Sequence, residues 1–507
     1  MANISLSVDC EIHCCEIDHC YTQVVVIGNG PSGICMSYFL SGNWPYYNGQ
    51  PHQLEFLQQR LIENQGISIL EQDLEYLSSG LEGRSSNPVS LLFDNLHHPN
   101  ADMGAEEESC LQWIHDKNRQ IPHVVLGNGL PGGTWQQMDD TLLTLSLSNW
   151  MELPGMEFKK WLQDTRLQND ESARPDNNNR ANVSEVAQYY TEYVRKMNLG
   201  DNFYSNVKVT SVKKLTGMRV INSENGEPEI ACRRCRRLEG ENMFEVKGIA
   251  RHNDLGTEEP FCIFTPNVVL ATGTSDDPNR LFVPGEDLNY VSHNLKKLEE
   301  AIVNEEIVSN SDPVLIVGAG LSAADAILYT QSLNIPVMHA FRRKASNKNQ
   351  PLRSLPKLLY PEYNLIYNMM NSGPQSNKNY LNLQQHTLVE FRSDRTVLLK
   401  NSEGTEREIK VSHACVLIGS KPKLDFLPDN GKSYSVHTNS PVTCKGNPIH
   451  VDPYTMESNM EPGLYAIGPL VGDNFVRFLQ GGALAVASNL IQKKTSSHLS
   501  SPNRLER

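Results

Sequence analysis

A glycine-rich turn near the start of the chain has the residue types and spacing that bind a pyrophosphate. Gly28, Gly30 and Gly33 follow the apolar run 23–27 and precede the helix-compatible segment 34–40. In a G-x-G-x-x-G sequence the first glycine permits a tight turn, the second lets backbone amides approach phosphates, and the third lets the helix pack on the strand. The helix N-terminus then favours negative charge. Alone the pattern is a weak indication, since glycine-rich turns are common.

A second copy of the pattern strengthens the prediction. Gly318, Gly320 and Ala323 follow the apolar run 313–317, with alanine in the third small position. Two such fingerprints in one chain predict two dinucleotide sites; one site and an unrelated glycine turn is the alternative.

The residues after the second fingerprint favour a phosphorylated nicotinamide cofactor. The expected second strand of that domain, 337–341, ends in Arg342, Arg343 and Lys344. An NAD-binding fold places a carboxylate for the ribose at about this distance, whereas basic side chains accommodate the 2′-phosphate of NADP. We therefore expect NADPH rather than NADH; an arginine-rich solvated turn is the alternative.

In the first domain the sequence predicts a second strand over 66–71 that ends in Glu71. A carboxylate there can take the hydroxyls of an adenosine ribose, with Asp73 as the reserve candidate. The spacing from Gly33 is longer than usual, so an insertion must be assumed. Residues 74–120 are expected to form an excursion with loop character.

Small and aromatic residues follow two further apolar strands. Gly132, Gly133 and Trp135 come after the expected strand 123–127 and suggest a backbone that passes close to a flat ring; a turn beside a core tryptophan is the alternative. Gly273 ends another buried strand in a tight turn.

Charge and composition exclude several classes of protein. The net charge of −14 argues against nucleic acid or an anionic membrane as the main partner. The sequence contains no run of eighteen or more apolar residues, so no membrane-spanning helix is predicted. The first twenty residues carry four acids and no Lys or Arg, unlike a secretory signal or transit peptide. Eleven cysteines, an odd number, predict a reduced, cytoplasmic protein.

Two cysteine clusters are candidates for metal or redox chemistry. One, within 10–20, contains four cysteines and two histidines, and the other is Cys232-x-x-Cys235. Neither has the repeated spacing of a structural zinc site. We therefore predict no metal, and interpret the clusters as a solvated arm and a basic surface loop.

The order of these motifs resembles that of the two-dinucleotide flavoproteins, which include the flavin-containing monooxygenases. More narrowly, the sequence resembles the oxidative-stress-induced growth inhibitor family. The segments that carry this narrower resemblance are 26–35, 81–88, 313–326, 355–357, 359–363 and 468–478.

The resemblance implies FAD at the first fingerprint, NADPH at the second, and monooxygenase chemistry on a small-molecule substrate and O₂, linked to growth, differentiation and the oxidative-stress response. It also implies that Asn149 lies near the flavin. Gly468 and Asp473 precede the small-residue helix 480–487, where a helix N-terminus and an acid suit the flavin ring and ribityl chain. A disulfide reductase and a non-catalytic scaffold or redox sensor are the alternatives. Protein partners are not identified by the sequence.

The fold class predicted is α/β, with two Rossmann-like dinucleotide-binding domains, the NADPH domain inserted in the FAD domain, and a small β-meander from strands near 206–213, 244–251 and 260–264. The predicted boundaries are an N-terminal arm at 1–20, the FAD-binding domain at 21–285 and 411–492, the NADPH-binding domain at 286–410, and a disordered tail at 493–507.

Overall fold

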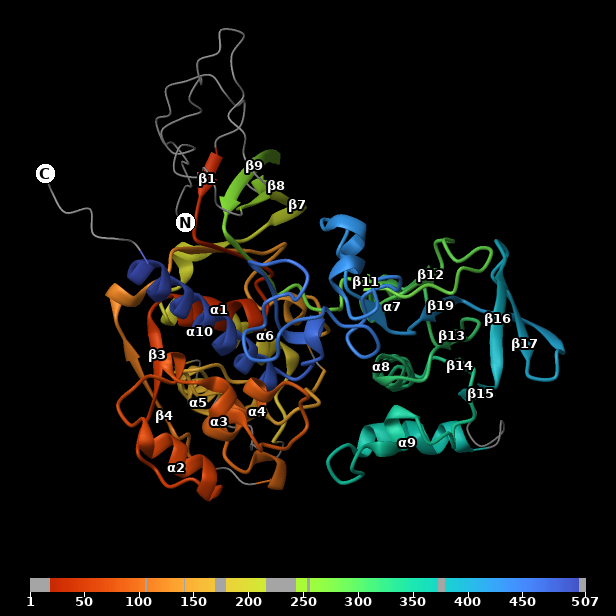
Figure 1. Ribbon diagram of the computed structural model, residues 1–507. Coiled ribbons are helices and arrows are strands. Elements are labelled where there is room, and N and C mark those ends of the chain that lie inside the picture. The colour runs from red at the N-terminus through yellow and green to blue at the C-terminus, as the bar shows by residue number, and fades with distance from the viewer. Residues whose placement is uncertain are drawn as a thin grey trace, which may run out of the picture. The chain divides into compact units, whose positions relative to one another are not determined.

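The computed structural model describes residues 19–104, 107–140, 142–168, 179–215, 243–252, 256–372 and 379–500. Cys232, Cys235 and the cysteines at 10, 14 and 15 lie outside these ranges. The chain divides into two compact units, Met1–Thr274 with Pro422–Arg507, and Ser275–Lys421 (Figure 1). The second unit is therefore inserted in the sequence of the first.

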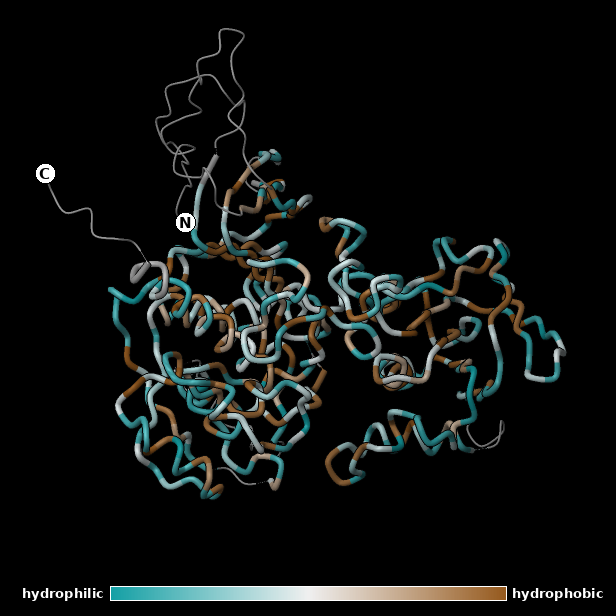
Figure 2. The backbone as a smooth tube through the Cα atoms, in the orientation of Figure 1, coloured by the Kyte–Doolittle hydropathy of each residue, from teal (hydrophilic) through white to brown (hydrophobic). Residues whose placement is uncertain are grey.

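The first unit is built on a five-stranded parallel sheet. Its strands lie in the order β21-β10-β2-β5-β6. They span Leu464–Ala466, Asn267–Leu270, Val24–Ile27, His123–Leu126 and Phe203–Tyr204. The central strand consists of Val and Ile and is completely buried, as expected for a parallel sheet covered on both faces. Figure 2 shows hydrophobic stretches, drawn in brown, alternating with hydrophilic ones along the chain.

Two helices that follow strands of this sheet, one after β2 and one after β21, complete the core. Helix α1, Pro31–Leu40, starts directly after the first fingerprint and is almost entirely buried. Helix α10, Val476–Ser500, packs on α1 and also on α4, Pro88–His97. The predicted disorder from Lys493 is wrong as far as Ser500, where α10 ends; neither Pro nor Gly occurs between Lys493 and Ser500.

The region between α1 and β5 differs from the prediction. The neighbours of β2 in the sheet are β10 and β5, and residues 66–71 form no strand, so the strand predicted there is wrong. Ile69–Glu71 instead forms the 3₁₀ turn η1, because the Ser68 hydroxyl accepts a hydrogen bond from the Leu70 N–H and donates one to Pro45. Residues 74–120 are also not a loop. They contain α3 (Leu74–Ser78), α4 and β4 (Leu111–His115), which pairs antiparallel with β3 (Asn43–Tyr47).

The predicted β-meander is confirmed. Strands β7 (Val207–Leu215), β8 (Met243–His252) and β9 (Thr257–Thr265) pair antiparallel, and β1 (His19–Tyr21) adds to β9 in parallel. Helix α6 spans Val183–Lys196, and its tyrosines Tyr189, Tyr190 and Tyr193 are core residues.

The second unit contains another five-stranded parallel sheet, in the order β12-β19-β13-β14-β15. Its strands span Val291–Ser292, His413–Val416, Val314–Val317, Val337–Phe341 and Tyr380–Gln384. The helices of this unit are α7 (Leu295–Val303), α8 (Leu321–Ser332) and α9 (Pro361–Asn371). A small antiparallel sheet is formed by β16 (His386–Phe391), β17 (Thr396–Asn401) and β18 (Glu406–Lys410).

The boundary predicted at 411 is wrong, because the strand that follows it, β19, pairs with β13 and stays in the second unit. The chain enters and leaves this unit through two short strands that pair antiparallel, β11 (Asp277–Pro278) and β20 (Ser420–Lys421). Within the part of the chain that the structure describes, no helix is both long enough and apolar enough to cross a membrane.

Candidate dinucleotide-binding sites

The first fingerprint has the backbone geometry of a phosphate-binding turn. Gly28 has a φ of 111°, and a Cβ at this position would lie 2.3 Å from the carbonyl oxygen of Ala271. A Cβ at Gly33 would lie 1.9 Å from the Gly28 oxygen. A Cβ at Gly30 would meet no described atom within 4 Å, so this glycine faces open space at the start of α1. Packing therefore requires the outer glycines, and the middle one leaves room for phosphates.

The loop after β5 lies directly against this turn. The Gly132 N–H donates a hydrogen bond of 2.9 Å to the Asn29 carbonyl. A Cβ at Gly133, which has a φ of 57°, would lie 3.1 Å from the Gly30 Cα. Trp135 is partly buried, and its ring centroid lies 6.2 Å from that of Tyr190. The contact with Tyr190 agrees with the alternative of a turn beside a core tryptophan. A flat ring beside this backbone stays a prediction.

The loops after β10 and β21 reach the same edge of the sheet. A Cβ at Gly28 would lie 3.0 Å from the Thr272 nitrogen, and Gly273 has a φ of 68°. A Cβ at Gly468 would lie 2.4 Å from the Ser32 hydroxyl on α1. The Thr272 hydroxyl is buried and has no partner among the described residues, as expected where a polar ligand binds. Carboxyl ends of parallel strands form the usual site of dinucleotide binding.

The predicted ribose carboxylate, Glu71, is not at this edge. It lies on η1, is exposed, and pairs with Arg119 at 3.3 Å. The strand next to β2 is followed by Gly127 and the exposed Asn128. A Cβ at Gly127 would lie 2.1 Å from the Asn29 side chain, so this position excludes any carboxylate. The exposed Asn128 is therefore the polar side chain that follows the strand next to β2, and the sequence pattern did not reveal it because the second strand was assigned elsewhere.

Asp473 has a structural role in the loop before α10. The buried carboxylate accepts hydrogen bonds from the Ser85 hydroxyl at 2.6 Å, the Asn87 amide at 2.6 Å and the Ser90 hydroxyl at 2.7 Å. Burial raises the pKa of Asp473, and these three donors oppose that rise. Both carboxylate oxygens therefore tie the loop to α4 and the segment before it. A contact between Asp473 and a flavin stays a prediction.

Asn149 lies on the 3₁₀ turn η5, Ser148–Met151. Its side-chain oxygen is buried and has no hydrogen-bond partner among the described residues. A buried acceptor without a donor is costly, so a ligand that donates a hydrogen bond suits this position. The position of Asn149 beside a flavin also stays a prediction.

The second fingerprint repeats the geometry of the first. Gly318 has a φ of 139°, and a Cβ there would lie 2.1 Å from the Leu417 oxygen, whereas a Cβ at Gly320 would meet nothing within 4 Å. Burial lowers the pKa of His339 on β14 to about 4, so the ring is neutral. Its Nε2–H donates to the Gly318 carbonyl at 2.6 Å, and its Nδ1 accepts from the Tyr380 hydroxyl at 2.7 Å. This chain of hydrogen bonds fixes the turn to two strands.

Arg342 and Arg343 follow β14 directly, at the position predicted for the 2′-phosphate. Both side chains are exposed. Since β14 is the sheet neighbour of β13, the strand assignment on which the NADP prediction depends is confirmed. Neither guanidinium has a hydrogen bond or ion pair with the described residues, so both are available to a phosphate.

Comparisons with known proteins define the class of this protein. Residues 239–468 match the family described as pyridine nucleotide-disulphide oxidoreductase. The fold is shared with the bacillithiol disulfide reductase Bdr (YpdA) of Bacillus cereus, at 16% identity and a TM-score of 0.55, and with the ornithine hydroxylase PvdA of Pseudomonas aeruginosa, at 11% and 0.51. Each alignment covers 93% of this chain and 99% of the other. The protein is a two-domain flavoprotein oxidoreductase, for which FAD and NAD(P)H are the cofactors.

Within this class the chain belongs to the oxidative stress-induced growth inhibitor family. It is 46% identical over 479 residues to human oxidative stress-induced growth inhibitor 1, and the alignment covers 93% of this chain and 95% of that protein. The family resemblance drawn from the sequence is therefore confirmed, as is the predicted pair of cofactor types.

Proposed function

We propose that this protein is an NADPH-dependent flavin monooxygenase that acts on a small molecule and O₂ and thereby takes part in the control of growth, differentiation and the response to oxidative stress. The turn at Gly28 and Gly30 would hold the FAD pyrophosphate, and the turn at Gly318 and Gly320 that of NADPH. When bound, the flavin supplies the capacity to accept a hydride and to react, once reduced, with O₂. The protein binds and orients both cofactors.

The environment of the cysteines supports oxygen chemistry over disulfide reduction. A disulfide reductase needs an accessible pair of thiols, at least one with a lowered pKa. Among the described residues, the thiols of Cys35, Cys110, Cys262 and Cys415 are buried, and that of Cys444 is half-buried. Burial raises the pKa of Cys35, on α1, well above its usual value. These thiols do not suit redox catalysis.

The surroundings of the first site suit the exclusion of water. Behind the fingerprint lies a buried cluster that includes Ile34, Tyr189, Tyr190 and Tyr193, and Trp135 packs against its edge. A dry site protects a reduced flavin from wasteful reactions with water. The Tyr190 hydroxyl donates to the Met151 carbonyl, so the cluster also fixes the turn that carries Asn149.

An oxygen-admission experiment tests this proposal. The FAD-loaded protein is reduced with NADPH without oxygen, and absorbance spectra are then followed after O₂ is admitted. We expect a transient spectrum that differs from those of reduced and oxidised flavin, with NADPH consumption that depends on O₂. A direct return to oxidised flavin, together with NADPH-dependent reduction of a small disulfide that Cys232→Ser/Cys235→Ser abolishes, would establish the reductase alternative.

The second alternative, a non-catalytic scaffold or redox sensor, predicts a different result in the same experiment. Flavin would be bound but not reduced by NADPH, and no O₂ would be consumed. A cytoplasmic location stays a prediction from the cysteine content.

A further inference from the structure

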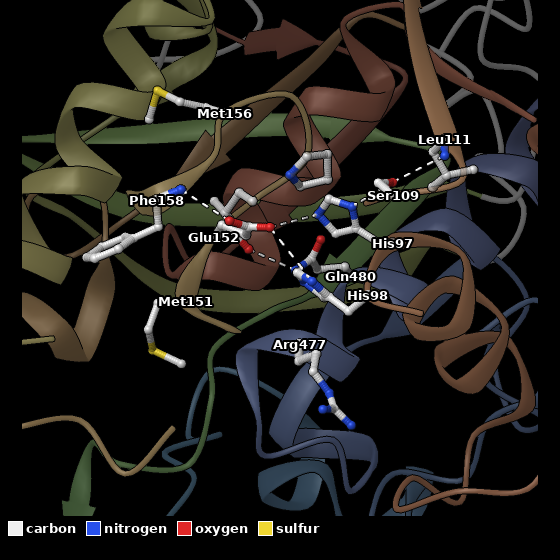
Figure 3. Close-up of polar contacts among 12 residues, drawn as sticks. His97, His98, Ser109, Leu111, Met151, Glu152, Met156, Phe158, Arg477 and Gln480 are labelled. Atoms are coloured by element: carbon white, nitrogen blue, oxygen red, sulfur yellow. Dashed lines mark hydrogen bonds and ion pairs between the residues drawn. The ribbon is translucent and has the colours of Figure 1, made fainter. Parts of the chain in front are cut away.

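Three side chains of types that bind metals lie close together in the first unit. They come from segments of the chain other than the glycine fingerprint. His97 and His98 lie at the end of α4, and Glu152 follows η5 (Figure 3). The side chains of the histidines are 8% exposed and that of Glu152 is 13% exposed. One ligand atom from each residue lies within 4.8 Å of the others. We call these three residues the His-His-Glu cluster.

The members of the cluster do not satisfy one another's hydrogen-bonding needs. The Glu152 Oε1 lies 4.0 Å from the His97 Nε2 and 3.7 Å from the His98 Nδ1, and both distances exceed those of a hydrogen bond. The Nε2 atoms of both histidines are buried and have no partner among the described residues. Buried polar atoms in folded proteins almost always have hydrogen-bond or metal partners. The unpartnered atoms of this cluster are therefore expected to contact a bound ligand.

The hydrogen bonds of Ser109 fix the tautomer of His97. The Ser109 hydroxyl donates to the Leu96 carbonyl at 3.3 Å and accepts from the Leu111 N–H at 3.2 Å. It therefore accepts from the His97 Nδ1–H, which lies 3.3 Å away. The lone pair of His97 is consequently on Nε2, the atom that faces Glu152. Metal-binding histidines typically donate their second ring N–H in this way.

Gln480 on α10 offers a fourth candidate metal ligand, its side-chain amide oxygen. Its Nε2 donates to the Glu152 carbonyl at 2.9 Å, which fixes the orientation of the amide. Its oxygen is buried and has no partner among the described residues. Figure 3 shows this side chain reaching the space beside the two imidazole rings. The site thus offers two imidazoles, one carboxylate and one amide oxygen.

The charges around the cluster favour a dication. Arg477 is buried and pairs with Asp94 at 2.8 Å and Asp102 at 2.5 Å, so these two carboxylates compensate its positive charge. With the three acids ionised, Asp94, Asp102 and Glu152 together with Arg477 and with Arg84, which lies 3.6 Å from Asp102, leave one negative charge in excess. A neutral imidazole is the form of histidine that binds metals.

We propose that His97, His98 and Glu152 bind a divalent transition metal, with Zn²⁺ as the best match to this donor set. Two histidines and a carboxylate are a known ligand set for zinc, and imidazole suits first-row metals in general. Bonds of about 2.0–2.2 Å at tetrahedral angles separate two ligand atoms by roughly 3.4 Å. The two contacts to Glu152, at 4.0 and 3.7 Å, need to shorten by roughly 0.3–0.6 Å, and no pair of ligand atoms, all within 4.8 Å of one another, needs to shorten by more than about 1.4 Å.

Metal analysis of the full-length protein tests this proposal. The cysteines at 10, 14, 15, 20, 232 and 235 are first replaced by serine, which removes the competing clusters, and metal content is measured after exposure to Zn²⁺ and gel filtration. We expect one equivalent of zinc per chain, and a rise in thermal unfolding temperature on adding Zn²⁺ to chelator-treated protein. His97→Gln and Glu152→Gln should lose both effects. Ser109→Ala, which removes only the hydrogen bond to His97, should weaken zinc binding by about 10–100-fold.

A matched variant separates metal binding from damage to the core. His123→Gln also removes a buried histidine of the same unit, one that hydrogen-bonds Ser37 instead of the cluster. It should retain the full zinc content. The proposal is overturned if protein with a cooperative thermal transition binds no zinc, or if His97→Gln binds as much zinc as His123→Gln.

Discussion

The two dinucleotide turns share their first two glycines but differ in the third small residue and in the residues that follow the neighbouring strand. In the first unit the third residue is Gly33, where a Cβ would lie 1.9 Å from the Gly28 oxygen. In the second unit it is Ala323, fully buried, with its Cβ 3.6 Å from where a Gly318 Cβ would lie. The same motif therefore allows a methyl group in one unit and excludes it in the other.

The residues after the neighbouring strand differ in charge between the two units. β5 is followed by Gly127 and Asn128, which are uncharged, whereas β14 is followed by Arg342 and Arg343. The first strand end offers no carboxylate for a ribose, and the second carries positive charge suited to an additional phosphate. The difference teaches that turns with the same first two glycines can differ in charge at the adjacent strand end, where we expect the choice between dinucleotides to be made.

The largest effect is expected from exchanging the third small residues. Gly33→Ala forces a Cβ into the Gly28 carbonyl, so we expect at least about 1–3 kcal/mol of destabilisation and loss of bound FAD. Ala323→Gly, at the start of α8, should cost only about 1 kcal/mol and leave the flavin content unchanged. Flavin absorbance per chain and thermal unfolding measure both effects. Full flavin occupancy in Gly33→Ala would contradict the close packing described for α1.

Removing the basic residues after β14 should be the next largest effect. Arg342→Ala and Arg343→Ala each lose a charge-assisted contact worth about 1.5–3 kcal/mol, so the Kd for NADPH should rise roughly tenfold or more. The Kd for NADH should not change, because NADH lacks the 2′-phosphate. Arg407→Ala, an exposed arginine on β18, serves as the control. Equal losses of NADH and NADPH binding would mean that the arginines do not select the cofactor.

The buried His339 makes the stability of the second unit depend on pH. Its folded-state pKa is about 4 and its ordinary pKa is 6.5, so the unfolded chain binds more protons between these values. The stabilisation is therefore complete above about pH 6.5 and declines by about 1 kcal/mol per pH unit as the pH falls towards 4. Chemical denaturation of the wild type and His339→Gln between pH 7.5 and pH 5 measures the difference. We expect a shallower pH dependence in the variant; parallel curves would contradict this pKa.

The smallest effect is expected at the ribose position of the first unit. Asn128→Asp introduces a carboxylate where β5 ends, so the Kd for FAD should fall by less than about tenfold. Glu71→Ala should not change FAD binding, because Glu71 lies on η1 and pairs with Arg119. Fluorescence titration of the flavin-free protein with FAD gives both values. Weaker FAD binding in Glu71→Ala would restore the original assignment.

The sequence was sufficient wherever a strong local pattern defined the structure. Both glycine turns, their buried strands, the β-meander and the strand before Arg342 lie where the patterns predict. Each depends on interactions between residues close in sequence, or on a run of buried β-branched residues that only a parallel sheet accommodates.

The failures of prediction involve partners that are distant in sequence. The segment ending in Glu71 is apolar enough for a strand, but Ser68 and Pro45 hold it in a 3₁₀ turn. The strand His413–Val416 was assigned to the wrong unit, because its apolar residues do not reveal which sheet it joins. The His-His-Glu cluster was missed for the same reason, since Glu152 lies more than fifty residues from the histidines, and only the His97-His98 pair was visible as a signal.

The central claim is that the two nucleotide sites work together as one oxidoreductase that prefers NADPH. The most direct test is an anaerobic titration of the FAD-loaded protein with NADPH and, separately, with NADH, followed by flavin absorbance. The account predicts that NADPH bleaches the flavin and that NADH does so only at much higher concentration. A fully flavin-loaded protein whose absorbance neither cofactor changes would contradict it, and would instead indicate a scaffold that binds nucleotides without turnover.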